Sequence, residues 1–326
     1  MDHAKTLKLT RRSFFGAACL CCMLPRRLFA DAPMVKRQAP GFYRLMVGDF
    51  EVTALSDGAS PMPAMKLLQG DRIRIIEDLR RNYLAPNVET SHNSFLVNSG
   101  AKLVLIDAGA GTLLGPHTGQ LISNLRAAGY WPEQVDEIYL THMHADHIGG
   151  LMSGNERTFA NATVRVDKRE IDYWLCEANA RIAPEDAKRF FQAATVSITP
   201  YMQAGKLLPF EGDTELVPGV SSQTAYGHTP GHTMYMVESK GEKLLLWGDV
   251  VHVAAVQFDD PTVTIQYDVN PSQAEQVHES AFADAAAKGY MVGGAHVSFP
   301  GLGHVRRDGE KAYAFVPLNY SAGIAG

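Results

Sequence analysis

The sequence lacks any run of about 20 apolar residues, so no membrane span is expected. It also lacks an excess of positive charge, because 30 lysines and arginines stand against 35 aspartates and glutamates. The net charge of −5, without any long basic run, argues against a nucleic-acid partner. What remains is a chain of 326 residues, 46% of them hydrophobic, which suits one large globular domain or two small ones.

Cysteine is scarce as well, and three of the four cysteines lie in the first 32 residues. This segment resembles a bacterial twin-arginine export signal: residues 10–15 read Thr-Arg-Arg-Ser-Phe-Phe, a short apolar stretch follows, and Ala30-Asp31-Ala32 fits a cleavage site. The alternative is a basic tail or a short anchor. We predict that residues 1–32 are cleaved on export to the periplasm, leaving one domain over 33–326. Cys176 would then be the last cysteine, so no internal disulfide can form.

Strand and helix patterns alternate in both halves of this domain. Apolar or alternating runs predict strands over 42–47, 50–55, 94–98, 103–107, 135–140, 221–226, 233–238, 244–247, 291–295 and 312–316. Apolar periodicity predicts helices over 71–82, 118–128, 167–179, 184–194 and 272–288. The remainder of segment 60–90, which is richer in proline, methionine and charge, is expected to be a loop. This order predicts a mixed α/β architecture in which helices cover sheets.

Four candidate metal ligands stand together in the run His-Met-His-Ala-Asp-His, directly after the apolar stretch 135–140. His142, His144 and Asp146 alternate with other residues, which is the period of extended chain, so their side chains can point one way. His147 breaks the alternation and would point elsewhere. The run therefore predicts two adjacent metal positions rather than one.

Three later positions supply further ligand types at the ends of turns or strands. His228 is the second residue of the run Gly-His-Thr-Pro-Gly-His-Thr. Asp249 follows the predicted apolar strand 244–247, and His296 follows the predicted strand 291–295. Rigid strands present functional groups at a sheet edge in this way.

These motifs, in this order, resemble the metallo-β-lactamase superfamily. The resemblance implies that residues 33–326 form a catalytic domain with a four-layer αββα sandwich fold. It also implies two bound divalent metal ions. Zinc is the expected ion, and manganese, cobalt or iron are the alternatives. The resemblance further implies that His142, His144 and His228 hold one ion, that Asp146, His147 and His296 hold the other, and that Asp249 bridges both. His232 is expected to support the site by hydrogen bonding, and Asp57 and Asp107 to stabilise turns or the ligand histidines.

Two adjacent metal ions point to hydrolysis. Such ions lower the pKa of a shared water from 15.7 toward ~7, and the resulting hydroxide attacks a carbonyl carbon or phosphorus. We expect Asp249, Asp146 and His252 to take part in catalysis. His252, three residues after Asp249, would hydrogen-bond the substrate carbonyl or the departing phenolate; the alternative is a structural histidine.

A closer resemblance concerns the substrate. Segments 42–44, 48–58, 254–261 and 298–301 are similar to methyl parathion hydrolase and its lactone-hydrolysing relatives. This implies a homodimer that cleaves dihydrocoumarin-type lactones or aryl esters. The alternatives are a phosphotriester hydrolase, a homoserine lactone hydrolase, and a metal-dependent redox or binding module.

The same resemblance implies a substrate pocket whose lining departs from the phosphotriesterase pattern. The expected lining residues are Leu67, Leu114, Trp174, Phe190, Ile265 and Tyr267. Leu67 stands where the phosphotriesterase has arginine, Leu114 where it has phenylalanine, and His252 where it has leucine. These departures favour a lactone or aryl ester over a phosphotriester. The alternative for the aromatic residues is core packing.

Overall fold

The computed structural model describes Ala32 and residues 34–322, and it contains two separate units, Met1–Ala39 and Pro40–Gly326. Ala32 and residues 34–39 of the first unit form no helix or strand. The predicted export signal, Ala32 apart, lies outside the described residues. None of the described helices is long and apolar enough to cross a membrane.

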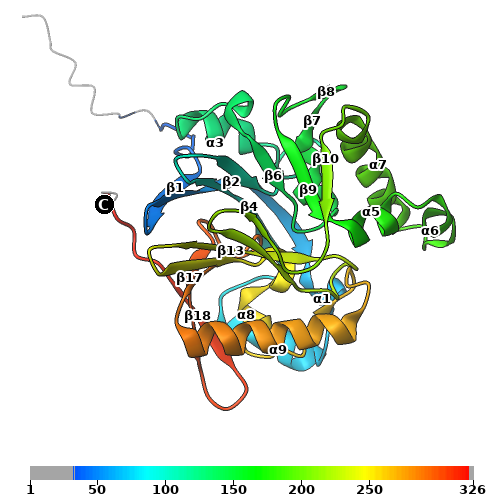
Figure 1. Ribbon diagram of the computed structural model, residues 1–326. Coiled ribbons are helices and arrows are strands. Elements are labelled where there is room, and N and C mark those ends of the chain that lie inside the picture. Colours follow the sequence, from blue (N-terminus) through cyan, green and yellow to red (C-terminus); the bar gives the residue numbers. More distant parts are fainter. Residues whose placement is uncertain (1–31, 33, 323–326) are drawn as a thin grey trace, which may run out of the picture. The chain divides into compact units, whose positions relative to one another are not determined.

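Two seven-stranded sheets form the centre of the second unit (Figure 1). The first sheet runs in the order β1 (Phe42–Val47), β2 (Phe50–Pro63), β4 (Asn87–Asn98), β5 (Leu103–Ile106), β6 (Glu137–Tyr139), β9 (Thr163–Asp167) and β10 (Leu207–Phe210). The second runs in the order β11 (Glu215–Val217), β12 (Val220–Thr224), β13 (Thr233–Ser239), β14 (Glu242–Leu246), β16 (Met291–Gly293), β17 (Leu302–Arg307) and β18 (Tyr313–Pro317). Two short antiparallel pairs join β3 (Leu68–Gln69) to β15 (Thr264–Ile265) and β7 (Met152–Ser153) to β8 (Glu156–Arg157).

Helices cover the outer faces of both sheets. The α-helices are α1 (Ala64–Leu67), α2 (Arg72–Arg81), α3 (Leu121–Ala127), α4 (Ala145–Ile148), α5 (Lys168–Trp174), α6 (Glu177–Ile182), α7 (Lys188–Gln203), α8 (Ala254–Gln257) and α9 (Pro271–Lys288). Short 3-10 turns are η1 (Pro132–Gln134), η2 (Gly149–Leu151) and η3 (Gly248–Val250). In Figure 1, α3, α5 and α7 lie on the side of the first sheet and α9 on the side of the second.

The alternation of side chains along each strand produces these layers. In β4, Phe95 faces the apolar cluster between the two sheets, where it meets Leu246 of β14. Its neighbour Leu96 faces the opposite way, into the cluster that includes Leu125 of α3. Successive residues of a strand point to opposite faces, so one strand serves both layers. The predicted αββα sandwich is confirmed.

Local signals explain the helix ends that the sequence predicted. The side chain of Asp71 accepts hydrogen bonds from the backbone N–H groups of Ile73 and Arg74 at the start of α2. Helix α9 begins at Pro271 and ends before Gly289, whose φ of 69° is left-handed.

Other predicted boundaries were wrong because tertiary pairing overrides local signals. Residues 60–63, expected to be loop, extend β2 and pair with residues 87–90 of β4 beyond a bulge near Gly58. The predicted helix over 167–179 is divided into α5 and α6, and α7 continues to Gln203. The sequence patterns also missed β9, β10 and β17.

Candidate metal centre

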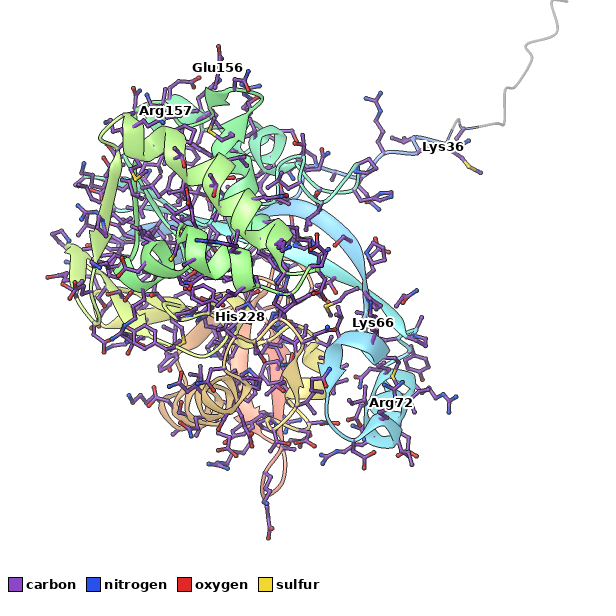
Figure 2. The ribbon with its side chains drawn as sticks, turned by 90° about the vertical axis from the view of Figure 1, so that its right-hand side faces the viewer. Lys36, Lys66, Arg72, Glu156, Arg157 and His228 are labelled. Carbon is purple, nitrogen blue, oxygen red and sulfur yellow. The ribbon has the colours of Figure 1, made fainter. Side chains whose placement is uncertain are left out.

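The loops after four strands of the two sheets deliver the candidate ligands to one place. His142, His144 and α4 follow β6 of the first sheet. Asp249 follows β14 and His296 follows β16, which run parallel to each other in the second sheet. The carboxyl ends of parallel strands meet at one sheet edge. His228 comes from the loop between β12 and β13 and lies where the two layers meet (Figure 2).

Glycines allow these loops to approach one another closely. Gly248, directly before Asp249, has a φ of 52°, and a Cβ there would lie 2.8 Å from His232 Nε2. A Cβ on Gly150, just after α4, would lie 1.9 Å from the carbonyl oxygen of Ala108. A side chain at either position would push the ligand loops apart.

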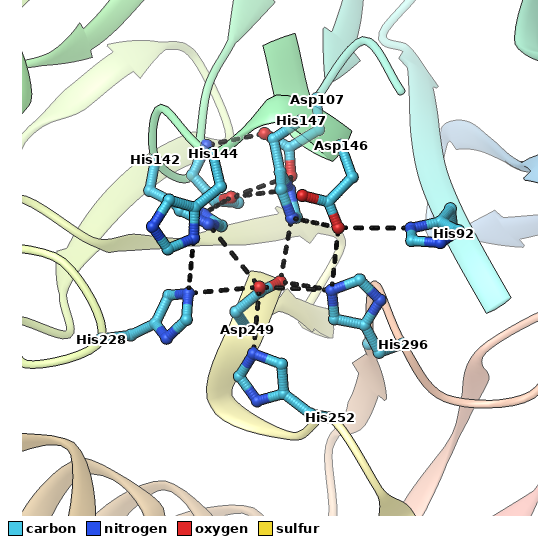
Figure 3. A network of polar contacts seen from close by, with 12 residues as sticks. His92, Asp107, His142, His144, Asp146, His147, His228, Asp249, His252 and His296 are labelled. Atoms are coloured by element: carbon cyan, nitrogen blue, oxygen red, sulfur yellow. Dashed lines mark hydrogen bonds and ion pairs between the residues drawn. The ribbon is translucent and has the colours of Figure 1, made fainter. Parts of the chain in front are cut away.

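Asp249 lies between two groups of side chains, as Figure 3 shows. We name His142, His144 and His228 the first ligand group and Asp146, His147 and His296 the second. Asp249 Oδ2 lies 3.3 Å from His228 Nε2 and 3.6 Å from His142 Nε2 in the first group. Asp249 Oδ1 lies 3.1 Å from His147 Nε2 and 3.2 Å from His296 Nε2 in the second.

The members of each group also converge on one another. In the first group, His228 Nε2 lies 3.1 Å from His144 Nδ1. In the second, Asp146 Oδ2 lies 3.4 Å from His296 Nε2 and 3.7 Å from His147 Nε2. The structure therefore brings all seven predicted ligands together around the shared carboxylate.

Most of the ligand imidazoles are held by their outer ring nitrogen. His228 Nδ1 donates to Asp268 Oδ1 at 2.7 Å, and His296 Nδ1 donates to the backbone oxygen of Ser91 at 2.9 Å. These hydrogen bonds leave Nε2 as the nitrogen that faces Asp249. Outer partners of this kind determine the tautomer and orientation of a metal-binding histidine.

Asp107 supports both ligand groups. Its Oδ2 accepts hydrogen bonds from His147 Nδ1 and from Thr141 Oγ1, each at 2.8 Å. Thr141 Oγ1 in turn lies 3.0 Å from His142 Nδ1. Asp107 has a φ of 61°, which is uncommon for a residue with a side chain and is characteristic of functional sites.

His232 and Asp57 stabilise backbone around the centre. His232 Nε2 accepts a hydrogen bond from the backbone N–H of Asp249 at 3.0 Å. Burial, followed by the nearby charge of His228, lowers the pKa of His232 to about 3, so its imidazole is a neutral acceptor. Asp57 accepts backbone hydrogen bonds from Ala110 and Leu121 and thus stabilises a turn.

The charges within the centre act on one another strongly. Burial, and then the charge of His147, hold the pKa of His142 well below its usual range. Burial alone would raise the pKa of Asp249, but the charges of His147 and His296 outweigh it and lower that pKa. The pKa of His228 is raised to about 9 because hydrogen bonds to Asp249 and Asp268 outweigh its burial. The carboxylates thus favour positive charge between the imidazoles.

The ligand atoms fit divalent metal ions. His142 Nε2, His147 Nε2 and Asp249 Oδ1 are buried and form no hydrogen bond with any described residue. A buried polar atom without a partner costs about 1–3 kcal/mol, which a bound cation offsets. Imidazole nitrogen and carboxylate oxygen are the ligands that zinc and related ions prefer.

A cavity of about 670 Å³ opens on the centre. His144, Asp146, Asp249, His252 and His296 contribute to its floor, and the predicted pocket residues Leu114, Phe190 and Tyr267 line its wall. Both ring nitrogens of His252 are buried without a hydrogen bond to a described residue, and Nε2 lies 3.2 Å from Asp249 Oδ2.

The other predicted pocket residues lie elsewhere. Leu67 and Trp174 line a second cavity of about 740 Å³, which shares Phe190 and Tyr267 with the first. Trp174 also packs in the core and donates from Nε1 to Glu170 Oε2 at 2.9 Å. The prediction for Ile265 is corrected: its side chain is fully buried in an apolar cluster and lines neither cavity.

Sequence reasoning missed Glu170 and Asp268. The buried carboxylate of Glu170 accepts hydrogen bonds from the backbone N–H groups of Met143 and Gly231, and so ties the two histidine loops together. Asp268 orients His228. No motif marks either residue; the available signal was an acidic residue directly after Tyr267 for Asp268 and one helical turn before Trp174 for Glu170.

Comparison with known proteins places this geometry in a family. The model of the metallo-beta-lactamase superfamily matches residues 88–296. A crystal structure of the hydrolase AbOPH in the beta lactamase superfamily is 35% identical, with a TM-score of 0.83 over 87% of this chain and 100% of that chain. AidC, a dizinc quorum-quenching lactonase in complex with a homoserine product, is 25% identical, with a TM-score of 0.80 over 86% of this chain and 98% of that chain.

Curated relatives match a shorter stretch. An N-acyl homoserine lactonase from Bacillus sp is 28% identical over 121 residues, which are 37% of this chain and 40% of the relative. A second, from Bacillus cereus, is 27% identical over 127 residues, which are 39% of this chain and 42% of the relative. The chain therefore spans about two fifths of the length of these curated relatives.

Proposed function

Since this chain belongs to the metallo-beta-lactamase superfamily, we propose that it is a hydrolase with two divalent metal ions, of which zinc is the expected one, and that it cleaves lactones or aryl esters of the dihydrocoumarin type. One observation carries the proposal. The carboxylate of Asp249 lies between two groups of ligand side chains, at the floor of a cavity with an apolar wall.

The chain's own side chains have separate parts in the reaction. The first ligand group would hold one ion and the second ligand group would hold the other. Asp249 would bind both ions. When bound, such ions supply a nucleophile at neutral pH by lowering the pKa of water from 15.7 toward ~7, and they polarise the carbonyl of the substrate. Asp146 lines the cavity, and its partly exposed carboxylate can accept the proton that the attacking water releases.

His252 is the residue that would assist the substrate. It lines the cavity beside Asp249, its Nε2 lies 3.2 Å from Asp249 Oδ2, and its Nδ1 forms no hydrogen bond with a described residue. One ring N–H can therefore donate to the carbonyl oxygen or to the departing oxygen. Replacement His252→Leu should lower lactone turnover while both metal ions stay bound; unchanged lactone kinetics would exclude this role.

The wall of the cavity supports an apolar, uncharged substrate. Leu113, Leu114, Phe190 and Val196 contribute to the wall, and Arg189 is its one lysine or arginine among the described residues. An aryl lactone presents a flat apolar ring to such a wall and a carbonyl to the floor.

N-acyl homoserine lactones are a second candidate substrate. The curated relatives bear that name, and AidC is a lactonase with a homoserine product. The second cavity continues beyond Phe190 and Tyr267 and offers space for an acyl chain. Phosphotriester cleavage would be a side activity at most.

The test compares rates on three substrates with the metal-loaded protein. Dihydrocoumarin, an N-acyl homoserine lactone and methyl parathion are supplied to protein whose metal content has been measured. We expect the largest kcat/KM for one of the two lactones. Protein that binds two equivalents of zinc and hydrolyses none of the three would contradict the proposed function.

Homodimer formation and export to the periplasm are part of the same proposal. Light scattering of protein beginning at residue 33 tests the dimer. Fractionation of cells that express the full chain tests the export, with a variant carrying Arg11→Lys and Arg12→Lys as the control.

A further inference from the structure

His92 lies in β4 beside the second ligand group, although no sequence motif marks it. Its side chain is 6% exposed, and its ring meets that of His296 edge-on with the centroids 5.2 Å apart. His92 Nδ1 lies 3.2 Å from Asp146 Oδ2, which is 3.4 Å from His296 Nε2 (Figure 3). One ligand atom from each of these three residues lies within 4.8 Å of the others, so all three can reach a single cation.

The hydrogen bonds of the outer ring nitrogens prepare these histidines for metal binding. His92 Nε2 lies 2.8 Å from Ser60 Oγ, just as His296 Nδ1 is held by the backbone oxygen of Ser91. When Nε2–H donates to Ser60, Nδ1 carries a lone pair. A metal-binding histidine is held by its other ring nitrogen in this manner.

The inner nitrogen of His92 resembles those of the predicted ligands. Nδ1 is buried and forms no hydrogen bond with a described residue, although a carboxylate oxygen lies only 3.2 Å away. His142 Nε2 and His147 Nε2 share this property. A lone pair that faces a carboxylate is stabilised by a cation between the two.

We propose that His92, Asp146 and His296 form a further position for a divalent transition-metal ion, which overlaps the second ligand group. The proposal rests on the proposed dinuclear centre, because Asp146 and His296 serve both positions. The two positions differ in their remaining ligands, which are His147 and Asp249 in one and His92 in the other. Two imidazoles and one carboxylate suit zinc and iron(II).

The competing arrangement uses the other tautomer of His92. Its Nδ1–H would donate to Asp146, and Ser60 would donate to Nε2. His92 would then only orient Asp146 and would not contact a metal ion. This arrangement predicts no metal ion next to His92 at any metal concentration.

Anomalous diffraction at the zinc edge distinguishes the two arrangements. Crystals of the zinc-loaded protein, soaked with increasing zinc, are expected to show a peak about 2.0–2.1 Å from His92 Nδ1. The peak should be absent in His92→Phe and in His92→Gln, while the peak at the first ligand group persists in both. His304→Phe, which replaces a half-buried histidine outside both ligand groups, is the matched control and should keep every peak.

A chelator-competition titration adds a solution measurement. In His92→Gln, the affinity of the weaker zinc equivalent should fall at least 10-fold. In Ser60→Ala, it should fall about 10-fold, which is typical of the loss of an outer hydrogen-bond partner. The affinity of the tighter equivalent should stay unchanged in both variants. Zinc at both ligand groups but none next to His92 would overturn this inference and leave the proposed function intact. Absence of zinc from both ligand groups would overturn both.

Discussion

The metal centre and the wall of the cavity beside it are held in place in different ways. Around the centre, ligand imidazoles are oriented by a second polar partner, as Asp107 orients His147 and Asp268 orients His228. The wall has no such network: Leu114 is 40% exposed, and Phe190 makes ring contacts with Tyr267 and His144. The centre is therefore constrained by many hydrogen bonds and determines the reaction. The wall is constrained by packing alone, and its side chains can change with the substrate.

The largest effect is expected from Asp249→Asn, which removes the charge between the two ligand groups. Because Asp249 approaches both groups, we expect a loss of kcat/KM well beyond the roughly 10- to 100-fold that removal of an outer partner causes. Metal analysis and lactone turnover measure it. Asp49→Asn, at an exposed surface position, is the control. Full activity of the Asp249 variant would show that the centre is less constrained than its contacts indicate.

Asp107→Asn tests the outer support of the centre. The amide nitrogen cannot accept the hydrogen bonds from His147 and Thr141, so we expect about a 10- to 100-fold loss of zinc affinity. Competition with a chromophoric chelator measures this loss, and the exposed Asp172→Asn is the matched control. Equal affinities for the two variants would contradict the role of Asp107.

Phe190→Ala tests the wall. Removing the ring enlarges the cavity and ends the packing of Phe190 against the His144 ring, but it removes no ligand atom. We therefore expect about a 10-fold rise in KM for an aryl lactone and an unchanged zinc content. Steady-state kinetics with metal analysis separate the two readouts. Tyr83→Ala, at a fully exposed aromatic residue, should leave both values unchanged. Loss of zinc in the Phe190 variant would mean that the wall also holds the centre together.

A buried histidine outside the ligand groups provides the smallest effect. Burial lowers the pKa of His278 to about 4, so between pH 6.5 and 4 the unfolded chain binds a proton that the folded chain excludes. Stability therefore falls as the pH falls through that window. His278→Gln should remove about 1 kcal/mol of the loss between pH 6.5 and 5.5.

Urea unfolding of chelator-treated protein at both pH values measures this difference, since the ligand histidines titrate equally in both proteins. His304→Gln, at a half-buried histidine on β17, is the control. An identical pH dependence in wild type and the His278 variant would show that His278 is charged in the fold. Such a result would mean that burial outside the metal centre does not keep a histidine neutral.

The sequence predicted which candidate ligands lie together better than the boundaries of the elements that carry them. The run from His142 to His147 follows a buried strand, and Asp249 and His296 each end another, so short-range pattern was sufficient to identify them. The extension of β2 through Pro63 was missed because prolines locally oppose a strand, and only pairing with β4 reveals it.

That pairing has a consequence for the centre. It places Ser60 next to His92 and brings His92 to Asp146, although these residues lie far apart in sequence. Glu170 and Asp268 likewise act on loops 27 to 61 residues away. No local pattern records such contacts, so these residues could not be found from periodicity or motif spacing.

The amino-acid sequence by itself determined the chemistry of the floor, because the ligand types and their spacing are local properties of a few short segments. It also determined the alternation of apolar residues that separates the layers. Only the tertiary structure decided which outer partners orient the ligands, that Ile265 is core while Leu114 is wall, and that His92 lies beside Asp146. Those outcomes depend on which distant backbones pack together, and packing is decided by the whole chain at once.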